Sequence, residues 1–529
     1  MIVGLNIQIV LAIVFIAWHY ALRCGFISDD HAVVAQRIDI IPDAERNPTK
    51  EPYWIKVFND GIVMYFINAV MTKLGLRRIP LAWHTLCLGL HLLNCYLLHL
   101  VLTPIIGLEM SLVATLLWGI NPMLNQCTVW VSGRPYLIAT MFALVIMLNW
   151  HQPIIVLPLF ILGVITNVSI GLLPIMLKIL HPGWQTTVYL IFMITGGTAW
   201  IVWKFNKRFS AALVLDRDNF RFTKRRFNTI VRIISYYVWG MFVPTKMGWY
   251  HQAGFRYNEK WEKFNVWTLI SWVIAVTLIQ QGFAGWWLIL GVLPNANMFA
   301  TNSFVQDRYV YWGGVGLAII MAPIVMSHPM ILPIAVTFYV TRSYMYSRQM
   351  VDDESMYREN WRNHPQSDYA INNLSFFLIK QMRFEEARVV IMRGLVINQS
   401  NKMLWYNLGV TWAATGHLGN DEGKFRFLKA IDCWKQALNI EPRWTKPAQD
   451  LQKMMKFLVD NKVLTIDKGE SAAGMPTIEI PTMKKPMLWA QMASSKRAEQ
   501  HIQKMNKEIE KIKGQMNEGD EWKQGGEDI

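Results

Sequence analysis

The sequence predicts an all-α protein, with a polytopic helical membrane domain of about ten to twelve spans followed by a short helical-repeat domain and a C-terminal amphipathic helix. Three observations predict this class. Apolar residues make up 53% of the chain and charged residues only 17%, against about 25% in an average soluble domain. Apolar runs close to bilayer length recur up to about residue 350, and a 34-residue repeat follows them. We therefore expect a membrane domain over 1–350, a helical-repeat domain over 351–461, and a linker with an amphipathic or coiled-coil tail over 462–529.

The membrane domain should begin with a retained helix over Leu5–Leu22 rather than a cleaved signal peptide. Met1–Tyr20 contains no Lys or Arg, and no small-x-small cleavage site follows it. Phe58–Leu76 is apolar but interrupted by polar residues, a pattern typical of a helix that lies in the membrane interface. The further expected spans are 80–103, 109–121, 129–150, 153–180 (one long or two short), 186–203, 230–243, 265–281, 284–300, 309–326 and 329–346.

A repeat appears beyond residue 350, where Asn373-Leu374 recurs as Asn407-Leu408. A spacing of about 34 residues is the tetratricopeptide period. The second copy includes Trp405 and Trp412 on its first helix, and Trp444–Asp460 follows as a possible cap. Because a stable solenoid usually needs about three repeats, we expect Tyr369–Phe457 to pack on the membrane part or on this cap. The alternative is a chance helical hairpin.

The C-terminal tail contains an apolar seam with alternating spacings of four and three. This seam predicts about three heptads of amphipathic helix over 498–516, packed on its own protein or on a coiled-coil partner. Its residues are Ala498, Ile502, Met505, Ile509, Ile512 and Met516.

The net charge of +15 has two interpretations. The basic stretch Lys204–Arg232, which includes Arg225 and Arg226, is either a cytoplasmic loop or a surface for an anionic lipid phosphate. We expect no nucleic-acid partner, because the basic residues lie between spans and no reader motif is present. The five cysteines lack metal-ligand spacing and are interpreted as small hydrophobic residues.

Three groups of residues could take part in chemistry. Asp29 and Asp30 follow the first span closely, and adjacent carboxylates raise one another's pKa, which favours a general base that works near neutral pH. Arg134 begins one apolar run, and the pair Asp307 and Arg308 begins another. Ionisable groups there are either functional or snorkelling anchors, and the planar arginine side chain suits a phosphate.

Taken in order along the chain, these residues resemble a known family. The segments that match are Phe26–Asp30, Pro80–His84, His91–Asn94, Asn121-Pro122, Val129–Arg134, Tyr236-Tyr237, Leu293–Asn297 and Asp307–Tyr311, followed by the repeats. The set resembles the TMTC-type O-mannosyltransferase-like proteins, which combine a GT-C glycosyltransferase membrane domain with tetratricopeptide repeats. The resemblance covers about residues 20 to 440. The sequence departs from the family pattern at Asn121, at Pro135 and Tyr136, at Asn167-Val168 and at Asp307.

The resemblance implies transfer of a sugar from a polyprenyl-phosphate donor to a protein or envelope-glycan hydroxyl on the non-cytoplasmic face. By the same resemblance, Asp29 is the expected base with Asp30 beside it, and Arg134, Arg308, Arg225 and Arg226 are expected to hold the donor phosphate. Asp307, Trp405 and Trp412 are expected to have acceptor or structural roles, with the repeats presenting a protein acceptor. We expect no cofactor and no metal.

The expected location is a bacterial inner membrane rather than the endoplasmic reticulum, with the repeats on the non-cytoplasmic side. Two other functions remain open. The chain could be a non-catalytic scaffold that recruits partners through its repeats and tail, which the altered motif positions would favour. It could also be a transporter, although no internal duplication of the membrane part is visible.

Overall fold

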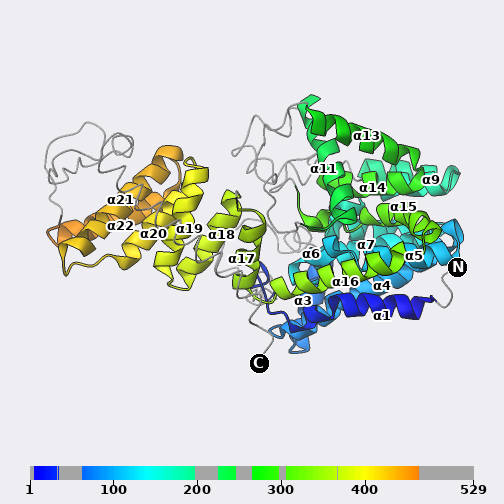
Figure 1. The fold of residues 1–529 in the computed structure, drawn as a ribbon, viewed down its shortest axis with the longest axis horizontal. Helices are drawn as coiled ribbons and strands as arrows, with labels where there is room; N and C mark the ends of the chain where they lie inside the picture. The colour runs from blue at the N-terminus through cyan, green and yellow to red at the C-terminus, as the bar shows by residue number, and fades with distance from the viewer. Residues whose placement is uncertain are drawn as a thin grey trace. The chain divides into compact units, whose positions relative to one another are not determined.

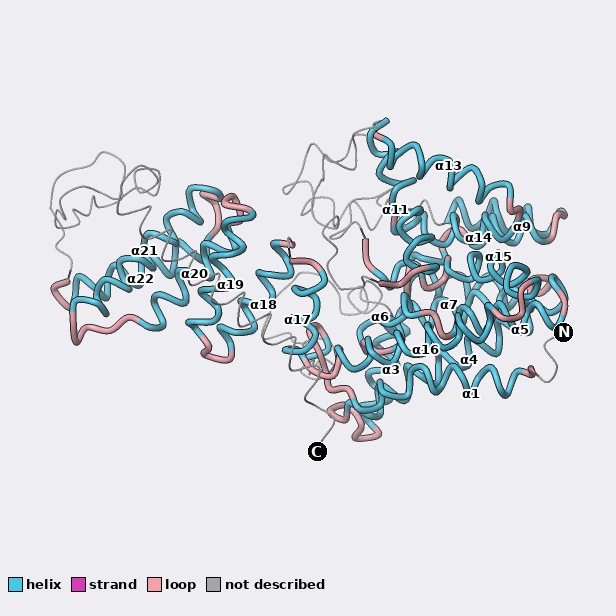
Figure 2. Tube along the Cα trace, viewed as in Figure 1, coloured by secondary structure: helices cyan, strands magenta, loops and turns pink. Residues whose placement is uncertain are grey.

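The computed structural model describes residues 5–31, 34, 62–196, 224–245, 265–296, 305–365 and 367–463. Within these ranges every regular element is a helix and none is a strand (Figures 1 and 2). The predicted all-α class is therefore confirmed for the described residues. The chain divides into two compact units, Met1–Thr411 and Trp412–Ile529.

The first half of the first unit forms helices in most of the expected ranges. In chain order they are α1 (Ile7–Trp18), η1 (His19–Arg23), α3 (Ile62–Lys73), α4 (Pro80–Ile106), α5 (Leu108–Gly119), η3 (Pro122–Leu124), α6 (Asn125–Thr128), η4 (Val131–Gly133), α7 (Arg134–Leu148), α8 (Pro153–Thr166), η5 (Val168–Ile170) and α9 (Leu173–Leu180). The expected range 153–180 forms two short helices. Asn167, whose side chain accepts a hydrogen bond from the backbone N–H of Ser169, ends the first of them.

Helices continue through the rest of this unit. They are a helix over 184–196, then α11 (Lys224–Phe242), α13 (Val266–Gln280), α14 (Phe283–Val292), η7 (Leu293–Asn295), η8 (Asp307–Val310), α15 (Gly314–Ser327), α16 (Ile331–Gln349), α17 (Asp353–Asn363), α18 (Asp368–Lys380) and α19 (Phe384–Ile397). Local chemistry sets several of the starts. Pro80 and Pro153 occupy the first turns of α4 and α8, where a missing N–H costs nothing. Asn265 and Thr268 form a reciprocal capping box at α13.

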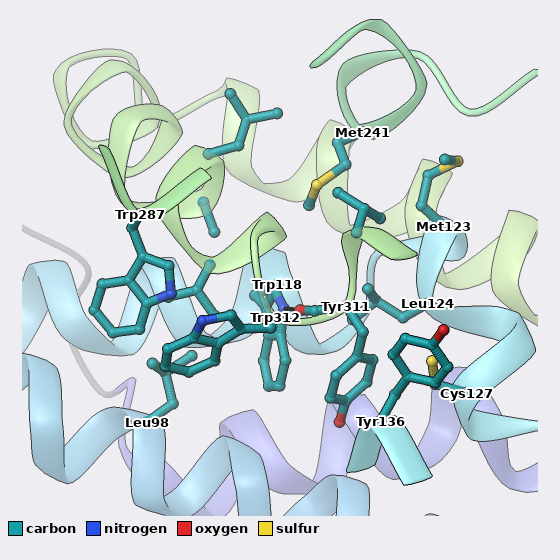
Figure 3. Packing of buried hydrophobic residues seen from close by; sticks show 14 of the residues in the cluster. Leu98, Trp118, Met123, Leu124, Cys127, Tyr136, Met241, Trp287, Tyr311 and Trp312 are labelled. Carbon is teal, nitrogen blue, oxygen red and sulfur yellow. Dashed lines mark hydrogen bonds between the residues drawn. The ribbon is translucent and has the colours of Figure 1, made fainter. Parts of the chain in front are cut away.

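The helices of the core pack closely where glycines allow it. Helix α5 packs against α4 and α15, α4 against α7, and α14 against α15. A Cβ added to Gly316 would lie 2.2 Å from the carbonyl oxygen of Ala284, so α14 and α15 can approach this closely only with glycine there. Trp287 and Trp312 fill the adjacent space with ring centroids 4.9 Å apart (Figure 3).

A buried hydrogen-bond network joins the core helices around His91. Nε2 of His91 lies 2.8 Å from the carbonyl oxygen of Gly119, and Nδ1 lies 2.8 Å from the hydroxyl of Tyr311. Because a carbonyl can only accept, Nε2 bears the proton and Nδ1 accepts from Tyr311. The Tyr311 oxygen in turn accepts from Nδ2 of Asn94 at 3.2 Å. Trp18 adds a bond from Nε1 to the same Gly119 carbonyl at 2.7 Å. A neutral histidine thus links α1, α4, α5 and the segment before α15.

The residues after 350 form paired helices with buried apolar seams. Leu374, Leu378 and Ala387 of α18 and α19 are fully buried. Helix α20 (Lys402–Thr415) reaches across the limit between the compact units, and α21 (Asp421–Ile440) and α22 (Thr445–Asp460) belong to the second unit. The first unit therefore continues to Thr411, and the boundaries expected at 350 and 461 stay predictions.

By length and composition, two of the described helices could cross a membrane. They are Pro80–Ile106, with 27 residues, and the helical stretch Val131–Leu148, with 18. Eight further apolar helices in the described ranges have only 10–17 residues. The expected number of spans stays a prediction. The tail seam at 498–516 lies outside the described residues.

Candidate functional site

Asp30 is completely buried and joins the first loop to the start of α7. Its Oδ1 accepts hydrogen bonds from the backbone N–H of Ser132 at 2.8 Å and from the Ser132 hydroxyl at 2.5 Å. Its Oδ2 accepts a weaker bond from the N–H of Ile27 at 3.3 Å. We call residues 24–31 the acidic turn. Asp30 fastens this turn to a segment about a hundred residues further along the chain.

Asp29 lies beside Asp30 but faces outward. Its side chain is exposed, whereas that of Asp30 is not. The preceding residue, Ser28, has a φ of +51°, a conformation that is common for glycine but uncommon for L-residues other than Asn, Asp and His. The turn therefore directs the two neighbouring carboxylates into opposite environments.

Burial raises the pKa of the Asp30 carboxyl to about 6. The hydrogen bonds from Ser132 and Ile27 and the positive charge of Arg134 act in the opposite direction and limit the rise. Burial is the largest cause of the rise, whereas the sequence suggested repulsion from the neighbouring Asp29. The expectation of a raised pKa is met at Asp30, but its expected cause was wrong.

Arg134 is held inside the protein by two helices. Its Nη1 donates to the carbonyl oxygen of Val131 at 3.0 Å, and its Nη2 donates to Oδ1 of Asn68 on α3 at 2.8 Å. The guanidinium also stacks over the ring of Trp83 on α4, 4.9 Å from the ring centroid. A snorkelling side chain would extend toward water, so that alternative is wrong for Arg134.

Arg308 is half-buried in a separate aromatic cluster. Its Nη1 donates to Oε1 of Gln126 at 3.2 Å, and its guanidinium lies 5.0 Å from the Trp130 ring and 5.4 Å from the Tyr309 ring. Asp307, its neighbour in η8, is fully buried. Tyr136 of α7, which Figure 3 labels, has its ring centroid 6.3 Å from that of Tyr309.

The segment Gln126–Arg134 connects the acidic turn with both arginines. Gln126 and Trp130 contact Arg308, Ser132 binds Asp30, and Arg134 ends the segment. Gly133 makes this fold possible, since a Cβ there would lie 2.0 Å from the carbonyl oxygen of Gln126. Only glycine allows η4 to return this closely onto α6.

The other expected site residues lie elsewhere or cannot be placed in the site. Arg225 and Arg226 belong to the first turn of α11, and their side chains lie outside the described residues. Trp405 donates from Nε1 to the carbonyl oxygen of Gln399 at 2.8 Å. The Nζ of Lys429 lies over the ring of Trp412, 4.4 Å from the ring centroid.

Sequence reasoning missed three contributors to the site: Asn68, Trp83 and Asp353. The polar Asn68 inside an apolar helix was a usable signal, since such a residue usually faces a partner. Asp353 gave no signal in the sequence, because its contacts with the acidic turn are with residues 325 and 322 positions away. Among the described residues, no group of three or more His, Cys, Asp or Glu side chains could hold a metal ion.

Comparisons of the chain with protein families, with curated proteins and with solved structures found no match.

Proposed function

We propose that residues 1–350 form a polytopic membrane domain, and the polarity of α13 is the observation that supports this most directly. This helix contains no charged residue, and its outward side chains include Trp267, Leu269 and Val273, the last of them 59% exposed. Its buried side contains the polar Thr268 and Ser271 beside the apolar Ala275 and Leu278. A water-soluble helix has the opposite arrangement, with its apolar face in the core. A lipid environment accounts for a helix whose exposed side is mostly large and apolar while its buried side includes polar side chains.

Helix α3 supports the same proposal in a different way. Its exposed apolar residues Ile62, Phe66 and Val70 are spaced by four and continue to Leu74, so they form one stripe. Asn68 lies on the other side of the helix and binds Arg134. A helix with one exposed apolar stripe and one polar contact with the protein suits the membrane interface.

A matched pair of substitutions tests the membrane proposal. Val273→Lys places a charge at the middle of α13, and Val389→Lys places the same charge at an exposed position of α19. A lysine at the centre of a membrane helix costs about 2.5–3.5 kcal/mol of insertion free energy. A lysine at a water-exposed position of α19 costs almost nothing. We expect Val273→Lys to reduce the yield of membrane-inserted protein and Val389→Lys to leave it unchanged. Equal tolerance of both would contradict the proposal.

Within this domain we propose a glycosyltransferase that uses a polyprenyl-phosphate sugar donor. The observation that supports it is the pairing of an exposed carboxylate, Asp29, with a turn fastened beside a buried arginine, Arg134. In the reaction, Asp29 accepts the proton of the acceptor hydroxyl as its oxygen attacks the anomeric carbon. The bond between that carbon and the phosphate oxygen breaks, and the lipid phosphate leaves with the bonding electrons.

The two arginines have different roles in this proposal. Arg308 is half-buried and can contact the donor phosphate, whose negative charge grows as the bond breaks. Arg134 is 1% exposed and bound to Val131 and Asn68, so it acts on the site through its charge and by holding α3 in place. Asp30 fixes the acidic turn, and Asp29 contacts the acceptor.

We also propose that α18 to α21 are tetratricopeptide repeats that present a protein acceptor. The helices begin and end close to where the 34-residue period predicts them. Nδ2 of Asn407 donates to Oδ1 of Asn372 at 3.0 Å, which joins near-equivalent positions of α20 and α18.

The test is sugar transfer in membranes that contain a radiolabelled polyprenyl-phosphate sugar. We expect Asp29→Asn to reduce transfer about 10²- to 10⁴-fold, and Arg308→Gln to raise the KM for the donor. Glu109→Gln, which neutralises an exposed carboxylate in the first turn of α5, is the control and should have no effect. Unchanged transfer by the Asp29→Asn/Asp30→Asn double variant would rule out the base assignment. If deletion of 351–529 alone abolished the cellular role, the scaffold function would be favoured instead.

A further inference from the structure

The carboxylate of Asp353 binds the acidic turn on both sides of Asp29 and Asp30. Its Oδ1 accepts a hydrogen bond from the backbone N–H of Ser28 at 2.6 Å, and its Oδ2 lies 3.0 Å from Nε2 of His31. Asp353 stands in the first turn of α17, far along the sequence from the turn that it binds. One side chain therefore holds the residue before the two aspartates and the residue after them.

Two further contacts join the acidic turn to the end of α16 and to the connection between α16 and α17. The N–H of Gly25 donates to the carbonyl oxygen of Val351 at 2.9 Å, and the thiol of Cys24 donates to the carbonyl oxygen of Ser347 at 3.3 Å. Ser28, with its φ of +51°, is the strained residue of the turn. A conformation of this kind persists only where surrounding contacts impose it, and the bond from Ser28 to Asp353 is such a contact.

Helix α17 is itself fixed to the helices that follow it by a ring of four charges. Arg358 pairs with Glu354 at 2.8 Å and with Glu386 at 2.5 Å, while Arg383 pairs with the same two acids at 2.7 and 2.6 Å. Single exposed ion pairs contribute little, but a closed network with two-point arginine contacts restrains the geometry. The ring ties α17 to the start of α19, within the same compact unit.

We infer that Asp353 is a positioning residue, which holds the acidic turn so that Asp30 stays buried against Ser132 and Asp29 stays presented outward. This inference rests on the proposed function for its catalytic consequence but not for its structural content. It connects α17, the first helix after residue 350, to the turn that contains the two carboxylates. The ring of charges then provides a path by which α18 and α19 restrain the same turn.

The experiment reads the environment of Asp30 by infrared titration of its carboxyl stretch in the purified full-length protein, with Asp30→Asn used to assign the band. We expect Asp353→Ala to let water reach Asp30, so that its pKa falls from about 6 toward the ordinary value near 3.9. Asp353→Asn retains a carbonyl oxygen for the Ser28 N–H and should restore most of the shift. His31→Ala, which removes one of the two contacts, serves if Asp353→Ala does not fold.

The control is Asp352→Ala, which removes the N-cap bond to the N–H of Ser355 at 2.8 Å and weakens α17 but leaves both contacts of Asp353 with the turn in place. It should leave the Asp30 band unchanged. An unchanged band in Asp353→Ala, or an equal shift in Asp352→Ala, would overturn the inference. In the transfer assay, Asp353→Ala should lower kcat about tenfold or more at unchanged donor KM, since misplacement by about 1 Å can cost that much. If the wild-type protein transfers no sugar, the proposed function fails, while the infrared titration still decides the role of Asp353.

Discussion

Ser132 binds Asp30 through two donors at once, its backbone N–H at 2.8 Å and its hydroxyl at 2.5 Å, and both reach the same carboxylate oxygen. This contact brings the end of the first helical segment to the start of α7. It also places a titratable group in a site without solvent contact, and the first two predictions follow from it.

Asp30 should make the protein less stable as the pH rises from about 4 to about 6. Its folded-state pKa of about 6 lies above the unfolded value near 3.9, so the folded state holds the extra proton in this range and the unfolded state does not. Stability therefore falls across the window and levels off above it, by up to about 3 kcal/mol for one buried group. Thermal melts of the wild type and of Asp30→Asn between pH 4 and 7 measure this. A constant difference between the two proteins would contradict it.

Removing the hydroxyl of Ser132 should raise the pKa of Asp30 further. That hydroxyl stabilises the charged carboxylate, and Ser132→Ala leaves only the backbone N–H on Oδ1. The infrared titration of Asp30 should move to higher pH in Ser132→Ala. Ser111→Ala, which removes a buried hydroxyl bound to His99 instead, should leave it in place.

Gly133→Ala should destabilise the protein, because the new methyl group would lie 2.0 Å from the carbonyl oxygen of Gln126 and backbone would have to move. Overpacking of this kind costs about 1–3 kcal/mol. Gly89→Ala is the matched control, since nothing lies within 4 Å of its added Cβ in α4. It should stabilise the helix by about 0.5–1 kcal/mol. Melting temperatures in detergent compare the two, and equal values would show that η4 and α6 are not packed as described.

Tyr311→Phe should disrupt the network around His91. The substitution leaves Nδ1 of His91 without its donor and removes one acceptor from Asn94, at a cost of about 1–3 kcal/mol for a buried polar group. Tyr96→Phe, at an exposed position of the same α4 that contains His91, should change the melting temperature little. A loss in Tyr96→Phe as large as that in Tyr311→Phe would show that the network contributes nothing specific.

Periodicity and hydropathy predicted many of the helices but not the contacts between them. The ranges 80–103 and 265–281 correspond closely to α4 and α13, because long apolar runs fix where helices form. Whether 153–180 was one helix or two depended on Asn167, which a hydropathy window averages away. The limits of the compact units depend on tertiary packing, which no local window contains.

The candidate site shows the same division. Charges beside apolar runs singled out Asp29, Asp30 and Arg134 in the sequence, and the fold brings their segments into contact through Asp30 and Ser132. Their different environments did not follow from the sequence, because only the fold decides that Asp30 is buried and Asp29 is not. The contacts of Asp353 with the acidic turn could not be predicted either, because they also depend on the fold.

The bonds around His91 also impose an order on biosynthesis. His91 and Gly119 emerge from the ribosome long before Tyr311, which lies 220 residues after His91. Until Tyr311 has been made, the His91 imidazole can bind the Gly119 carbonyl but lacks the hydroxyl that donates to its Nδ1. Helices α1, α4 and α5 therefore complete their shared hydrogen-bond network only after more than half of the chain has been made.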